Sequence, residues 1–153
     1  RIGGGIDAST PTAALGTKGI QFVTIATKGN SKDFGELTTA RYGVGGCSSP
    51  TRGLFAGGYG QPSFYNVIDS IEISTLGNAS DFGDLTQKTL YISGASSKTR
   101  GVWGGGYKVP SGADTNVIQF VTIASAGNAS DFGDLTTARR LTASCSDAHG
   151  GLE

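Results

Sequence analysis

Hydrophobic and polar residues alternate in short segments of this chain, and the alternation is clearest over residues 67–73. The side chains at 67, 69, 71 and 73 are Val, Asp, Ile and Ile, and those between them are Ile, Ser and Glu. A mixed pattern with a period of two residues predicts a β-strand that packs partly on both faces. Comparable segments occur at 20–25 and 117–123. The sequence therefore predicts an all-β fold.

A five-residue segment recurs three times and divides the chain into repeats. The residues Asp-Phe-Gly-Asp-Leu at 81–85 return unchanged at 131–135 and, with Glu in place of the second Asp, at 33–37. Their phenylalanines, Phe34, Phe82 and Phe132, are 48 and 50 residues apart. A period near fifty residues is typical of blade-type β architectures rather than of helical solenoids.

Each repeat contains short strand-like segments separated by turn residues, as one four-stranded antiparallel blade requires. In the second repeat we expect strands at 42–47, 53–56 and 67–73, and an edge strand anchored by Phe82 with Leu85. In the third repeat we expect strands at 91–95, 102–103 and 117–123, with Phe132 as the anchor. The first repeat offers Ile2, 20–25 and the anchor Phe34, and its innermost strand is absent.

These features together resemble the kelch repeat of β-propellers. A strand ending in a Gly-Gly pair is followed by a variable loop, an alternating strand, a turn, an aromatic residue three positions before a Leu, and a basic residue such as Arg41 or Arg139. Phenylalanine stands where kelch blades usually carry Trp. The amino-acid sequence of residues 77–86 is also similar to kelch-like repeats in structural proteins of marine bacteriophages. The resemblance implies a propeller with three four-stranded blades per chain, serving as a structural protein with the virion as its expected location.

The strand inventory predicts assembly with another copy. Residues 1–153 form one domain of approximate repeats 1–40, 41–88 and 89–138, and residues 139–153 supply an inner strand at 141–146 and the start of another at 150–153. Propellers typically have four to eight blades, so three cannot close alone. We expect a six-bladed, two-fold homodimer in which 141–146 of one chain completes the blade begun by 2–5 of the other. A ring of another size, or a piece of a longer propeller, is the alternative.

Charge and composition exclude two classes of partner. Lys and Arg number 12, as do Asp and Glu, so no net field draws the chain to nucleic acid or to an anionic membrane. No apolar run approaches the roughly 20 residues that a membrane-spanning helix needs. We therefore expect no nucleic-acid partner and no membrane. The 26 glycines follow no strict triplet period and favour tight turns and close strand packing.

Residues that could carry catalysis or bind metals are few. Cys47 and Cys145 are 98 residues apart, which places them at equivalent positions two blades apart. That separation exceeds the Cα distance of about 7 Å that a disulfide tolerates, so we expect two free, buried cysteines. Neither they nor the lone His149 show zinc-ligand spacing, and the Asn, Ser and Asp residues around 78–84 fit turns better than a calcium site. We expect no metal, no cofactor and no enzymatic activity.

The segments that follow the glycine pairs vary between repeats and are the candidate binding loops. They cover residues 6–19, 59–66 and 107–116, and we expect them to gather on one face of the ring. Their candidate ligand-binding residues are Tyr59, Gln61, Tyr65, Tyr107, Lys108 and Asp114. The function that we expect is a non-enzymatic, self-assembling structural or protein-interaction module. The alternative is a lectin-like propeller that stacks a glycan on Tyr59, Tyr65 and Tyr107, and purely solvated connectors also fit these loops.

Arg52 and Arg100 introduce the second strand of the second and third repeats and are 48 residues apart. Two positions fit them: a channel mouth or an ordinary solvated strand end.

Overall fold

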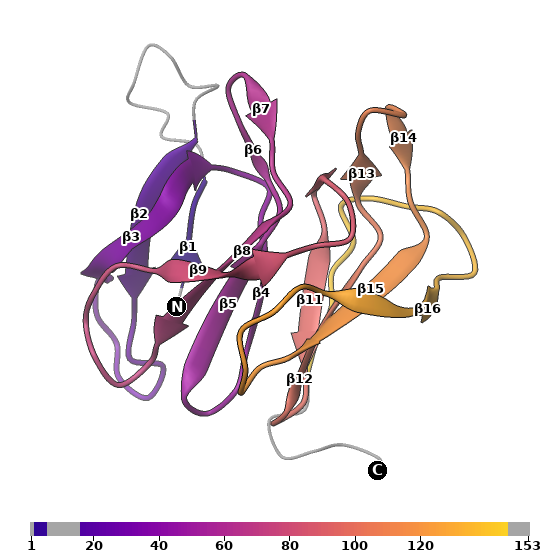
Figure 1. Cartoon of the computed structure of the whole chain (residues 1–153). Coiled ribbons are helices and arrows are strands. Elements are labelled where there is room, and N and C mark those ends of the chain that lie inside the picture. Colours follow the sequence, from indigo (N-terminus) through magenta and orange to yellow (C-terminus); the bar gives the residue numbers. More distant parts are fainter. Residues whose placement is uncertain (1, 6–15, 147–153) are drawn as a thin grey trace.

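The computed structural model describes residues 2–5 and 16–146, and these residues form β-strands, turns and irregular segments (Figure 1). All of the strand pairs are antiparallel, and they form several small sheets. The predicted all-β class is therefore confirmed. Within the described ranges no helix is long and apolar enough to cross a membrane.

Each repeat folds into its own sheet, and we name them the first, second and third sheets. The first sheet contains β1 (Ile2–Gly3), β2 (Thr17–Phe22) and β3 (Lys32–Arg41). The second sheet has the order β4 (Gly45–Ser48), β5 (Arg52–Ala56), β8 (Val67–Glu72) and β9 (Ser80–Asp84). The third sheet has the order β11 (Ser93–Ser96), β12 (Arg100–Gly104), β15 (Val117–Thr122) and β16 (Ser130–Asp134). Two repeats thus have the four predicted strands, and the first sheet lacks an innermost strand among the described residues.

The second and third sheets share one register. The register between β8 and β9 shifts between Ile68 and Asp69, and that between β15 and β16 shifts between Ile118 and Gln119. A bulge of this kind re-aims the side chain that follows it. The shifts therefore place Asp69 and Gln119 at matching positions, where both are fully buried.

The predicted inner strands begin too early in the chain. β4 and β11 start at Gly45 and Ser93, because a corner with positive φ precedes each of them: φ is 69° at Gly43 and 58° at Tyr91. A β-strand cannot contain that conformation. Leu141, at the equivalent position one repeat later, has a φ of 56°.

The prediction for β2 is displaced as well, since the strand covers Thr17–Phe22 rather than 20–25. Its neighbour β1 has only two residues, Ile2 and Gly3, and these pair with Gln21 and Ile20. Residues 23–25 consequently have no partner strand on that side within the described part of the chain.

Two short hairpins extend from the same end of the sheets (Figure 1). One consists of β6 (Tyr59–Gly60) and β7 (Ser63–Phe64), and Tyr59 forms a bridge with Tyr42. The other consists of β13 (Tyr107–Lys108) and β14 (Ala113–Asp114), and it pairs with β10 (Thr89–Leu90). The sheets therefore carry equivalent hairpins at this end.

The apolar core lies between consecutive sheets. One buried cluster joins the first sheet to the second and contains Ile20, Phe34, Leu37, Phe55 and Ile71. A larger cluster joins the second sheet to the third and includes Phe82, Leu85, Trp103, Val121 and Ile123. The second sheet thus covers the first sheet with one face and is covered by the third sheet on its other face.

Candidate assembly and binding surfaces

The junction between the first and second sheets is apolar and contains one buried ion pair. Phe34 and Leu37 of β3 are covered by Phe55 and Ile71 of the second sheet. Burying such side chains is the main favourable contribution to sheet stacking, at about 25 cal/mol per Å² of apolar surface. The anchor position predicted for Phe34 is therefore a packing position in the structure.

The ion pair joins Arg41 of β3 to Asp69 of β8, and both side chains are fully buried. Arg41 Nη2 lies 3.1 Å from Asp69 Oδ2, and Thr38 donates to the same carboxylate from its backbone N at 2.9 Å and from Oγ1 at 2.7 Å. Arg41 Nη2 also lies 3.3 Å from Phe55 O, whereas its Nε and Nη1 are buried without a hydrogen-bond partner in the described structure. Burial lowers the pKa of the Arg41 guanidinium below its ordinary value, and the Asp69 carboxylate opposes that shift. The carboxylate is thus better satisfied than the guanidinium.

The junction between the second and third sheets has the same plan with neutral polar groups. Phe82 and Leu85 are covered by the third sheet, where Trp103 is fully buried and donates from Nε1 to Gly45 O at 3.1 Å. Gln119 takes the position of Asp69, and its Oε1 accepts from Thr86 N at 2.8 Å and from Thr86 Oγ1 at 3.0 Å. Thr89, also fully buried, takes the position of Arg41.

The backbone contacts of the two junctions are identical in kind. Gly77 N donates to Phe34 O at 2.9 Å, and Gly127 N donates to Phe82 O at 2.8 Å. An asparagine side chain completes each turn: Asn78 Oδ1 accepts from Glu36 N at 3.1 Å, and Asn128 Oδ1 accepts from Asp84 N at 3.0 Å. The asparagine and the glycine before it in each turn therefore join one sheet to the edge strand of the sheet before it.

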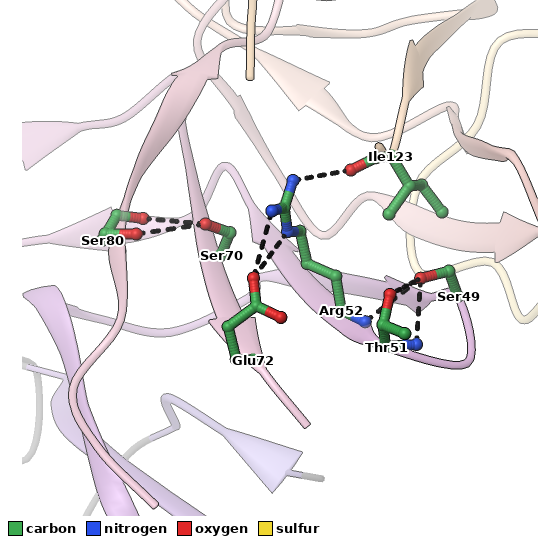
Figure 2. Close-up of polar contacts among 7 residues, drawn as sticks. All are labelled: Ser49, Thr51, Arg52, Ser70, Glu72, Ser80 and Ile123. Atoms are coloured by element: carbon green, nitrogen blue, oxygen red, sulfur yellow. Dashed lines mark hydrogen bonds and ion pairs between the residues drawn. The ribbon is translucent and has the colours of Figure 1, made fainter. Parts of the chain in front are cut away.

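Arg52 adds a further link between the second and third sheets (Figure 2). Its Nη1 donates to Ile123 O at 2.9 Å, while Nε and Nη2 each lie 3.1 Å from Oε1 of Glu72 in its own sheet. The guanidinium carbon is also 5.9 Å from the centre of the Phe82 ring. Arg52 is therefore an inter-sheet contact, which the sequence did not indicate, and Arg100 instead lies 5.0 Å from the Phe120 ring of its own sheet.

The outer face of the third sheet has no neighbouring sheet in the described part of the chain, and it exposes the residues that the two junctions bury. Phe132 is 53% exposed, whereas Phe34 and Phe82 are each 3% exposed. The leucine of the same motif behaves alike, since Leu135 is half-buried and its counterparts are buried. The predicted anchor Phe132 is uncovered because no further sheet packs against it among the described residues.

The outer face of the first sheet exposes apolar residues of the kind that cover the phenylalanine at the internal junctions. Ile2, Val23 and Ile25 are exposed, and the exposure of Ile25 reaches 97%. The equivalent positions of the third sheet are Trp103, Val121 and Ile123, which are all buried against the second sheet. The outer face of the first sheet thus has the apolar residues that cover a preceding sheet elsewhere, but among residues 2–5 and 16–146 no sheet lies against it.

The inner strand predicted at 141–146 is not a strand in the single chain. The segment nevertheless lies beside β11, where Ser93 Oγ donates to Ser144 Oγ at 2.8 Å and Ser96 N donates to Ser146 Oγ at 2.9 Å. It lacks the ladder hydrogen bonds of a strand because no second strand flanks it among the described residues. The continuation predicted at 150–153 lies outside the described residues.

Of the candidate binding residues, Tyr59, Gln61 and Tyr65 lie in or next to the β6–β7 hairpin. The Tyr59 ring packs against Phe64 at 4.7 Å and edge-on against Tyr42 at 5.6 Å. Gln61 is exposed at the hairpin tip, and Tyr65 is half-buried. Tyr42 also lies 6.4 Å from Tyr91, and burial, followed by the neighbouring Tyr91 and Tyr59, raises the pKa of Tyr42 above 10.0. The structure thus joins Tyr59 to an aromatic cluster that the sequence did not indicate.

The other candidates, Tyr107, Lys108 and Asp114, lie on the second hairpin, and all three are half-buried. Tyr107 and Asp114 are register partners. The guanidinium carbon of Arg140 lies 4.8 Å from the Tyr107 ring centre, and Arg140 Nε lies 3.3 Å from Asp114 Oδ1. Tyr107 and Asp114 therefore form one site with Arg140, a residue that sequence reasoning missed because it follows the last repeat. Most of the variable loop at 6–19, namely 6–15, lies outside the described residues.

Both cysteines are free, as predicted. Cys47 is half-buried, and burial raises the pKa of its thiol to about 12. Cys145 is exposed rather than buried, because the described residues flank its segment on one side only. Within the described ranges no group of three or more His, Cys, Asp and Glu side chains could hold a metal ion, and His149 lies outside those ranges.

Comparison with known proteins adds no identity. No protein-family model matches the chain, and no curated protein matches it. The geometry of the surfaces is therefore the basis for the functional argument.

Proposed function

We propose that this chain is a non-enzymatic, self-assembling β-propeller module of kelch-like blades, each sheet being one blade. Two copies close into a six-bladed ring, and the ring serves as a structural or protein-interaction module, with a phage particle as the setting that the repeat resemblance implies. One observation carries the proposal: the outer faces of the first and third sheets expose, position by position, the residues that the internal junctions bury.

The two faces are complementary because the internal junctions already combine them twice. Closure would place Phe132 of one copy against Ile2, Val23 and Ile25 of the other, and this would occur at two identical seams. Full burial of a large apolar side chain contributes about 1.5–3 kcal/mol. Two such seams form in a single association step, so both sets of contacts offset its cost of about 4–15 kcal/mol.

Sedimentation equilibrium or light scattering tests the proposal at micromolar protein concentration. We expect twice the chain mass of 15.5 kDa for the natural sequence and the single-chain mass for Phe132→Asp, because a carboxylate cannot be buried at the seam. Leu76→Asp is the matched control, since Leu76 is an exposed residue away from both faces, and its mass should stay doubled. A natural chain that remains a monomer throughout this range contradicts the ring.

A carbohydrate-binding ring is the second candidate, and the arrangement at the hairpin end supports it. Tyr107, Arg140 and Asp114 combine an aromatic ring with charged hydrogen-bonding groups, and the Tyr59 cluster lies at the same end of the sheets (Figure 1). A glycan array compared between the natural chain and Tyr107→Ala tests this. Binding that Tyr107→Ala removes would favour the lectin, and uniform silence on the array would contradict it.

A further inference from the structure

The innermost segments of consecutive sheets contact one another through a repeated serine. Ser96 Oγ donates to Ser48 O at 2.7 Å and accepts from Ser48 N at 3.2 Å, which links β11 to β4. In the same manner, Ser146 Oγ accepts from Ser96 N, and Ser144 Oγ donates to Gly94 O. Residues 141–146 are therefore held where the inner strand of a following sheet would lie.

β4 has no corresponding neighbour on its other side within the described residues. A Cβ atom added at Gly46 would meet nothing closer than 3.8 Å, whereas one added at Gly94 would lie 2.5 Å from Gly46 O. Gly94 is thus closed by the inner strand before it, and Gly46 is open. A groove of about 510 Å³ borders β4. Gly46, Ser48, Gly53 and Phe55 line it on the second sheet, and it continues past β4 to Ser96 and Ser146 of the same chain.

We infer that residues 141–146 of a second copy occupy this open side of β4 as the innermost strand of the first sheet. The inference rests on the proposed ring and specifies how its seam is built. The register follows from the second sheet, where Gly45 pairs with Ala56 and Gly46 with Phe55. At the seam, the corresponding pairs are Ala143 with Gly3 and Ser144 with Ile2 of the other copy.

Cys145 reports directly on this register. Its counterpart Cys47 packs against Gly101, where an added Cβ would lie 2.6 Å from Cys47 Sγ. Gly53 is the equivalent of Gly101, and it lines the groove beside β4. The thiol of Cys145, which is exposed in the single chain, therefore packs against Gly53 of the second copy once the seam forms.

Maleimide labelling of Cys145 tests the inference, with the native mass measured on the same samples. The Cys47→Ala background leaves Cys145 as the only thiol, and alanine suits position 47 because Ala95 occupies the equivalent position. We expect a doubled mass and labelling at least about tenfold slower than in a monomeric variant, because a buried thiol reacts only after local opening.

Gly46→Val in this background supplies the monomeric variant. Its side chain has room in the single chain but collides with the Ser144 carbonyl of the second copy, just as a Cβ at Gly94 would collide with Gly46 O. We expect an unchanged circular dichroism spectrum, the single-chain mass and fast labelling. Ser63→Val, at an exposed position of β7 in the hairpin, is the matched control and should keep the doubled mass and the slow labelling.

The outcomes separate the inference from the ring. A doubled mass with fast labelling of Cys145 overturns the inference and leaves the ring standing, whereas a monomeric natural chain overturns both. If Gly46→Val fails to fold, the test is a dilution series of the Cys47→Ala chain, in which the native mass and the labelling rate of Cys145 are measured at each concentration. Labelling that accelerates as the mass falls supports the register, and fast labelling at every concentration contradicts it.

Discussion

The two internal junctions have the same backbone contacts but differ in the groups that they bury. The first buries the ion pair of Arg41 with Asp69, and the second buries the neutral Thr89 and Gln119 at the same positions. Both buried acceptors bind a threonine of the preceding sheet, Thr38 or Thr86. The geometry thus requires an acceptor after the bulge, but it does not require a charge.

The two junctions also show that neutral side chains can take the place of the buried ion pair. Replacing a buried ion pair by groups that need no counter-charge is often neutral or stabilising, whereas removing one partner is strongly destabilising. Arg41 has two nitrogens without partners in the described structure, so its pair is only partly satisfied. The second junction has neutral side chains, Thr89 and Gln119, at the same two positions.

The largest effect is expected at the second junction, where Trp103→Ala removes a fully buried indole. The cavity and lost burial should lower the free energy of unfolding by about 3–5 kcal/mol, and the hydrogen bond to Gly45 O is lost as well. Urea unfolding followed by circular dichroism measures the change. Leu76→Ala, at an exposed position, is the control and should stay within about 0.5 kcal/mol. A Trp103→Ala chain as stable as this control would show that the sheets do not depend on junction packing.

The ion pair of the first junction gives the next effect. Asp69→Ala leaves the Arg41 charge buried and unpaired, and should cost about 3–5 kcal/mol of unfolding free energy. Gln119→Ala, the matched change at the neutral junction, removes only an acceptor and should cost about 1–3 kcal/mol. Equal losses in urea unfolding would show that the charge is irrelevant.

Converting one junction into the other sharpens the same comparison. The double variant Arg41→Thr with Asp69→Gln copies Thr89 and Gln119, and it should recover most of the stability that Arg41→Thr alone removes. A double-mutant cycle in urea measures this coupling. Additive losses would mean that the two junctions are not interchangeable.

The turn asparagines should show the smallest effect and no difference between the junctions. Asn78→Ala and Asn128→Ala each remove one exposed hydrogen bond to a backbone N, at a cost of about 0.5–1.5 kcal/mol. In the monomeric Phe132→Asp chain, Asn30→Ala should change nothing measurable, since its counterpart contact would lie across the seam. A clear loss there would show that Asn30 acts within its own sheet.

Cys47 lies at a closed junction and Cys145 is exposed, so we expect the two thiols to react with maleimide at different rates. The pKa of Cys47 is about 12, so at pH 8 only about one thiol in ten thousand is the reactive thiolate. In the monomeric Phe132→Asp chain, maleimide at pH 8 should therefore modify Cys145 and spare Cys47. The rate at Cys47 should rise as the pH is increased moderately above 8, and fast modification of Cys47 at pH 8 would contradict its burial.

The sheets could be predicted from the sequence because the signal for them repeats. Phenylalanine, glycine pairs and alternating strands return near every fiftieth residue, and the four strands of the second and third sheets follow that pattern. The strand bounds could not be predicted where the conformation is local, as at the corner residue Tyr91, whose positive φ nothing in its side chain indicates. The predicted range of β2 is wrong because the end of this strand depends on how far β1 pairs with it, and that pairing cannot be read from the residues of β2 alone.

The polar contacts of the junctions could not be predicted, since their chemistry does not repeat. Arg41 and Asp69 stand opposite Thr89 and Gln119 in the next repeat, so no charge pattern marks the pair. Aligning Asp69 with Gln119 would have indicated a conserved acceptor position within the chain. At the hairpin end, the tyrosines were predicted from loop composition, but Arg140 lies beyond the last repeat and reaches Tyr107 only through the fold.

The faces that meet at each junction are unlike, and this sets the rule by which copies can combine. A contact between unlike faces is heterologous, and it passes an unsatisfied face from one copy to the next until the chain of copies either meets itself or grows as a filament. In the proposed assembly, the rotation from one sheet to its neighbour would therefore set how many copies are added before growth stops, without any residue that marks an end.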